Sequence, residues 1–152
     1  MKQITILIVG GAATGRVPMT VALLGRLLEQ RGLAWEVAAA GVVAHDDAAA
    51  EVEARDAMLA LGLHISAYRA HSITDEMVAA AAVLIAVDSG TARVIYARYP
   101  EAAARTVTLG ELAGRARDIP DPFRMQVGAW ITYAREIESL LKAGLARLIE
   151  RA

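Results

Sequence analysis

The chain has 152 residues, 56% of them hydrophobic, and a formal net charge of −1 at pH 7. This composition predicts one well-packed domain over residues 1–152 and excludes a disordered chain. The balanced charge gives no sign of a nucleic-acid or membrane partner, and the absence of cysteine excludes disulfides and cysteine nucleophiles.

The first apolar run, Ile4–Val9, is followed directly by two glycines. It is too short for the core of a signal peptide or for a membrane span. We therefore expect a cytoplasmic protein.

Apolar runs and helical patterns alternate along the chain. The expected strands cover residues 3–9, 35–40, 82–87 and 106–109. The expected helices cover residues 18–30, 48–61, a short stretch after Thr74, 91–99 and 126–150. Short right-handed crossovers favour a mostly parallel sheet of about four strands with helices on both faces. The predicted fold class is therefore an α/β three-layer sandwich.

A loop of small residues, Gly10–Gly15, joins the first strand to the first helix. Its backbone amides and the helix N-terminus would attract an anion, and Arg16 adds a planar donor group suited to phosphate. Ligands of such folds bind at the carboxyl ends of the strands, where Asp88 and the loop around Asp121 also lie. The candidate anion-binding residues are Gly11, Ala12, Ala13, Thr14, Gly15 and Arg16.

One interpretation of this loop is a degenerate nucleotide-binding site. Gly10-x-x-x-x-Gly15-Arg16-Val17 is close to G-x-x-x-x-G-K-[ST], but Val17 lacks the hydroxyl that holds magnesium. The glycines, with Glu36 downstream, also fit a loose dinucleotide pattern. A second interpretation is a tight turn in a purely structural or interaction protein.

A third interpretation rests on several motifs in order. Arg16 and Pro18 fit the loop motif C-x5-R-[ST]-P, which places its cysteine position at Gly10. Four further segments are Ala39–Gly41 (similar to S-A-G), Leu61–Ala70 (G-I-D-L-S-x-H-x-[AS]-R), Val87–Asp88 (M-D) and Asp118–Phe123 (D-[IV]-x-D-P-[FY]). Over nearly its whole length the chain thus resembles the low-molecular-weight protein-tyrosine phosphatase family. This resemblance implies the phosphotyrosine phosphatase I-like fold.

The resemblance also implies roles for individual residues. In the family a thiolate attacks phosphorus, the arginine clamps the phosphoryl oxygens, and the aspartate acts as general acid and base. That aspartate corresponds to Asp121, and Phe123 would flank a ligand at the cleft edge. Gly10 leaves the nucleophile position vacant, while Val17 and Ala13 replace the usual hydroxyl residue and asparagine.

We therefore expect a catalytically impaired member that binds phosphate, sulfate or a phosphorylated protein or small molecule in the Gly10–Arg16 loop, without metal or cofactor. The enzymatic alternative is a weak phosphatase that uses water and Asp121. Each residue also has a structural explanation: Arg16 pairs with Asp88 or Asp121, Asp88 caps a helix, and Asp121 shapes its turn. Gly10 is expected to leave a small void for water or the anion.

Overall fold

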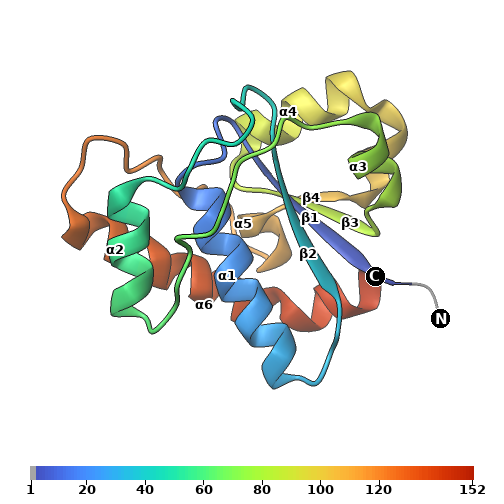
Figure 1. Cartoon of the computed structure of the whole chain (residues 1–152). Helices are drawn as coiled ribbons and strands as arrows, with labels where there is room; N and C mark the ends of the chain where they lie inside the picture. The colour runs from blue at the N-terminus through green and yellow to red at the C-terminus, as the bar shows by residue number, and fades with distance from the viewer. Residues whose placement is uncertain (1–2) are drawn as a thin grey trace.

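The computed structural model describes residues 3–152 and contains a four-stranded sheet in the order β2-β1-β3-β4 (Figure 1). All neighbouring strands are parallel. The strands are β1 Thr5–Gly10, β2 Glu36–Gly41, β3 Val83–Ala86 and β4 Thr106–Thr108. Because β1 is an interior strand, its apolar run is buried on both faces.

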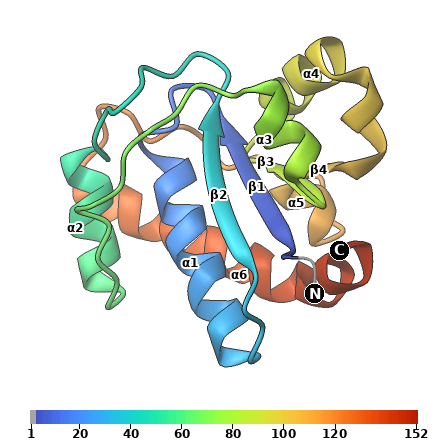
Figure 2. The same cartoon turned by 45° about the vertical axis from the view of Figure 1, so that its right-hand side comes forward.

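Helices cover both faces of the sheet. They are α1 Arg16–Gln30, α2 Val52–Ala60, α3 Asp75–Ala80, α4 Ser89–Arg98, α5 Leu109–Leu112 and α6 Val127–Arg151, with the 3-10 helix η1 Pro100–Arg105. Figures 1 and 2 show α1 and α6 across one face and α3 and α4 across the other. Within residues 3–152, no helix combines the length and the apolar character needed to cross a membrane.

Alternate side chains of β1 enter two separate cores, as the pleat of a strand requires. Ile6 and Ile8 belong to the core formed with α1 and α6. Leu7 and Val9 belong to the core formed with α3 and α4. The expected three-layer α/β sandwich is therefore confirmed.

Two parts of the chain differ from the expected elements. The helix expected over 48–61 begins only at Val52, because the preceding segment turns at Asp47 (φ 67°) and Ala49 bridges to Arg69. The helices η1 and α5 were not expected. For α5 a sequence signal existed, since Thr108 and Glu111 form a capping box.

Candidate anion-binding site

The first loop, defined here as residues 10–16, lies where the carboxyl ends of β1, β2 and β3 meet. It surrounds a cavity of about 80 Å³, which is far smaller than the usual pocket for an organic ligand and suits a compact ion. The lining residues are Gly10–Val17, Glu51, Val87 and Asp121. The structure thus brings together all the predicted anion-binding residues and Asp121. Glu51 was not predicted.

The loop carbonyls bind partners outside the loop. The donors are Val42 N to Gly10 O (2.9 Å), Val43 N to Gly11 O (3.1 Å), Tyr68 Oη to Ala13 O (2.5 Å) and Glu51 N to Thr14 O (2.9 Å). In a planar trans peptide the N–H points opposite to the C=O. The following amides therefore face the cavity that they line, and within residues 3–152 the amides of 11–15 have no hydrogen-bond partner. Such convergent unpaired donors are suited to an anion.

Arg16 forms one wall of this cavity. Its Nη1 lies 2.9 Å from Asp88 Oδ2 and donates to Ile119 O at 2.7 Å, so the guanidinium joins the end of β3 to the loop of residues 118–123. The expected pairing of Arg16 with Asp88 is confirmed. Both contacts use one nitrogen of a group with five N–H donors, which leaves capacity for a ligand.

Asp88 has two structural roles at once. Its Oδ1 accepts from Thr91 N at 2.7 Å, so Asp88 caps α4 as expected, while Oδ2 pairs with Arg16. Burial opposes ionisation, but the hydrogen bonds from Thr91 and the charge of Arg16 outweigh it and lower the pKa of Asp88. Asp88 therefore remains an anion near neutral pH and partly neutralises Arg16.

Val17 occupies the space beside Gly10. A Cβ atom on Gly10 would lie 2.6 Å from Val17 Cγ2 and 3.3 Å from Val87 Cγ2. A buried methyl group of Val17 therefore fills the position of a side chain at residue 10, while the small cavity that Gly10 also lines provides the expected space for water or an anion. Gly10 and Val17 are sterically matched.

Glu51 adds a second carboxylate to the cavity. Its Oε2 accepts from Thr14 Oγ1 at 3.2 Å. Burial raises the pKa of Glu51, the charges of Asp121 and Glu53 raise it further, and the Thr14 bond opposes them. Carboxylates in an anion site oppose binding, and this repulsion falls when one of them gains a proton or when the ligand also carries positive charge.

Asp121 begins a tight turn on an exposed loop. Its Oδ1 accepts from Phe123 N at 3.1 Å, which confirms the expected turn-shaping role. Ile119 is buried near the start of the loop of residues 118–123, and its carbonyl accepts a hydrogen bond from Arg16. Phe123 is 59% exposed and does not line the small cavity.

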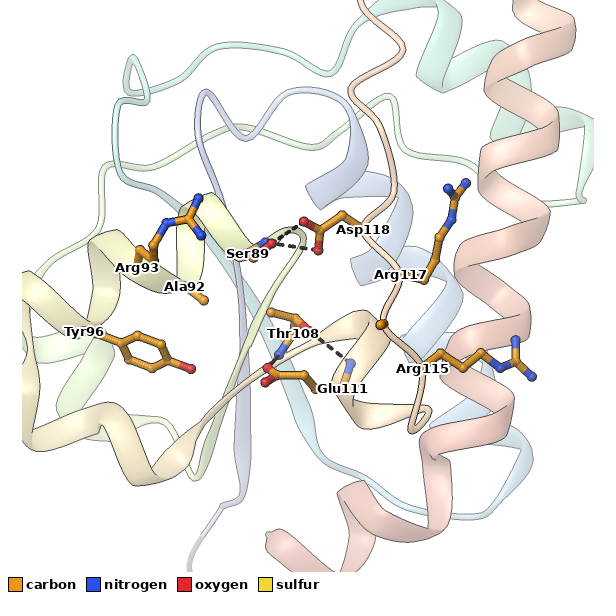
Figure 3. Close-up of a pocket in the computed structure, with 10 residues that line it drawn as sticks. Ser89, Ala92, Arg93, Tyr96, Thr108, Glu111, Arg115, Arg117 and Asp118 are labelled. Atoms are coloured by element: carbon orange, nitrogen blue, oxygen red, sulfur yellow. Dashed lines mark hydrogen bonds between the residues drawn. The ribbon is translucent and has the colours of Figure 1, made fainter.

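A larger cavity of about 460 Å³ lies between α4, α5 and residues 115–118 (Figure 3). The side chains of Arg115 and Arg117 extend away from it, so mainly their backbone forms its wall. At its edge Asp118 accepts hydrogen bonds from both the amide and the hydroxyl of Ser89. This link fixes the start of the Asp121 loop to α4.

Together, the parallel sandwich and the amide-lined loop beside an arginine define an α/β domain with a candidate anion-binding loop after its first strand. Residues 5–152 match the family model of the low molecular weight phosphotyrosine protein phosphatases. The chain therefore belongs to this family, and it contains no cysteine. No cluster of three or more potential metal-ligating side chains occurs within residues 3–152.

Relatives of the chain carry different specificities in their names. A protein-arginine-phosphatase of Geobacillus stearothermophilus is 33% identical over 138 residues, 90% of each chain. A probable low molecular weight protein-tyrosine-phosphatase, EpsP, of Ralstonia nicotianae is 31% identical, with 97% of each chain covered.

Solved structures show the same fold. The low molecular weight protein tyrosine phosphatase from T. tengcongensis has a TM-score of 0.90 and 28% identity, covering 99% of this chain and 100% of that one. The tyrosine phosphatase Wzb from Escherichia coli K30, solved in complex with sulphate, has a TM-score of 0.85 and 26% identity, covering 95% and 97%.

Proposed function

We propose that this protein binds phosphate, sulfate or a phosphorylated residue in the first loop and does not turn it over. The supporting observation is that the amides of residues 11–15, in the cavity wall, have no hydrogen-bond partner within residues 3–152. Those of residues 11, 12, 14 and 15 follow carbonyls that are bonded outside the loop and so face the cavity. The N-terminus of α1 and Arg16 add positive charge at the same place. A family member that binds sulphate supports the same ligand chemistry.

Loss of turnover follows from the residues at the start of the loop. We infer that Gly10 occupies the position of the family's cysteine, so no covalent phosphoenzyme forms through it. Val17 blocks the adjacent space, and its side chain can neither attack nor donate a hydrogen bond. Asp121 would remain as a general acid and base, which alone contributes only about 10²–10⁴-fold to a rate.

Calorimetric titration with inorganic phosphate tests this proposal. We expect saturable one-site binding by the wild type and at least roughly tenfold weaker binding by Arg16→Ala, because charge-assisted hydrogen bonds contribute about 1.5–3 kcal/mol. Arg93→Ala is the matched control, since Arg93 is exposed on α4 and does not line the small cavity. The proposal fails if the wild type does not bind, or if Arg16→Ala and Arg93→Ala bind equally well.

Glu51 and Asp121 favour a more specific ligand, a phosphoryl group attached to a cation. The guanidinium of phosphoarginine would offset their negative charge, and one relative is a protein-arginine-phosphatase. For phosphoarginine, Glu51→Gln should weaken binding, whereas for inorganic phosphate or sulfate it should strengthen binding. Titrating the wild type and Glu51→Gln with phosphoarginine and with phosphotyrosine decides between the two ligand types. If the substitution changes the affinity for both ligands equally, the site does not select its ligand by charge.

A further inference from the structure

Ala13 adopts a conformation that its side chain does not favour. Its φ of 61° lies in the left-handed region, and Ala13 is almost fully buried. An L-residue in this region is disfavoured unless it is glycine or a residue such as asparagine whose side chain hydrogen-bonds locally. Alanine has no such side chain, so neighbouring groups must hold this turn of the first loop.

Tyr68 is the neighbour that holds it. Its hydroxyl donates to the carbonyl of Ala13 at 2.5 Å, across 55 positions of sequence. The other loop carbonyls described above accept from backbone amides, which almost any sequence supplies. Among the carbonyls of residues 10–14, and within residues 3–152, only that of Ala13 accepts from a side chain. Because this carbonyl points outward, the amide of Thr14 is directed into the cavity.

The segment that carries Tyr68 is itself fixed. Tyr68 N donates to Ile65 O, Ala70 N donates to Ala48 O, and Arg69 bridges to Ala49. Burial raises the pKa of Tyr68 well above its ordinary value, so its hydroxyl keeps its proton and remains a donor. Tyr68 does not line the cavity, so it acts on the loop rather than on a ligand.

The sequence pattern explains why this contact matters here. The resemblance described above implies asparagine at position 13 and, when the glycine of its motif is aligned with Gly62, histidine at position 68. This chain has Ala13 and Tyr68 instead, and the longer tyrosine reaches the backbone directly. We propose that Tyr68 is a positioning residue that presets the first loop for anion binding by holding the Ala13 carbonyl; its effect on affinity rests on the function proposed above.

The test compares Tyr68→Phe with the matched control Tyr133→Phe, since Tyr133 is also half-buried and has no hydrogen bond through its hydroxyl within residues 3–152. Without ligand, we expect shifted NMR signals at residues 13–15 in Tyr68→Phe only. With inorganic phosphate, we expect roughly three- to tenfold weaker binding, the range for one lost hydrogen bond. Adding Ala13→Gly should recover part of this affinity, because glycine adopts positive φ without strain.

The two proposals can fail separately. If the wild type does not bind phosphate, the NMR signals of residues 13–15 without ligand still test the contact between Tyr68 and Ala13. The role of Tyr68 is overturned if Tyr68→Phe leaves the signals of residues 13–15 unchanged. It is also overturned if affinity falls but Ala13→Gly restores none of it, because the loss would then not be conformational.

Discussion

Gly10 and Val17 illustrate how two residues of the first loop depend on each other. The missing side chain at Gly10 makes room for a methyl group of Val17 at the bottom of the loop. Neither residue can change alone without a steric or packing cost. We therefore expect the pair to stabilise the loop in a form without a side chain at position 10.

Their coupling is measurable by unfolding in urea. We expect Gly10→Ala to destabilise the protein by about 1–3 kcal/mol, because its Cβ would overlap Val17. In the double variant with Val17→Ala, the overlap disappears, and the loss should be smaller than the sum of the two single losses. Additive losses would show that the two side chains do not share this space.

Glu51 makes anion binding depend on pH. Its raised pKa means that it gains a proton on acidification before an ordinary glutamate does, and this proton removes a negative charge from the cavity. We expect sulfate affinity to rise as pH falls toward that pKa. Asp88, with its lowered pKa, keeps its charge over this range. Sulfate is the appropriate probe because it remains a dianion throughout.

The corresponding variant is Glu51→Gln. It should bind sulfate roughly fivefold more tightly than the wild type at neutral pH, as expected for removal of about 1 kcal/mol of repulsion, and its affinity should vary less with pH. Glu53→Gln is the control, because Glu53 lies nearby on α2 but does not line the cavity. An unchanged pH dependence in Glu51→Gln would contradict the assignment.

At the scale of elements, α5 and α6 pack closely at Gly144. A Cβ there would lie 2.6 Å from Leu112 Cγ and 2.7 Å from Leu112 O. We expect Gly144→Ala to destabilise the protein by about 1–3 kcal/mol in urea unfolding, although alanine is the better helix former. Gly25→Ala in α1 is the control: nothing lies within 4 Å, so it should stabilise by up to about 1 kcal/mol. Similar effects of both substitutions would contradict the packing described.

The sequence predicted the helices and strands better than the contacts between residues that are distant in the chain. All four strands lie close to the expected ranges, and Gly, Pro and capping residues located most helices. The start of α2 could not be predicted, because Ala49 leaves helical geometry to pair with Arg69, 20 positions away. Glu51 and Tyr68 were missed for a similar reason. Glu51 contacts the first loop across 37 positions of sequence and Tyr68 across 55, and no local pattern marks either contact.

For the molecule as a whole, the parallel sheet determines where the site lies. The order β2-β1-β3-β4 places the first loop, Asp88 and the segments from Glu51 and Tyr68 around the carboxyl ends of adjacent strands. This arrangement is the family's fold, and it holds the loop carbonyls outward without any contribution from a cysteine. The proposal that this chain binds a phosphoryl group without transferring it rests on this arrangement.

Phosphorus NMR of phosphotyrosine with an equimolar amount of protein tests this central claim directly, because one spectrum reports both binding and turnover. We expect the phosphotyrosine signal to shift and broaden with the wild type, to return toward its free form with Arg16→Ala, and to give no inorganic phosphate over hours. Inorganic phosphate that accumulates with the wild type and is lost with Asp121→Asn would contradict the account and establish a water-dependent phosphatase. An unchanged phosphotyrosine signal would contradict binding of this ligand.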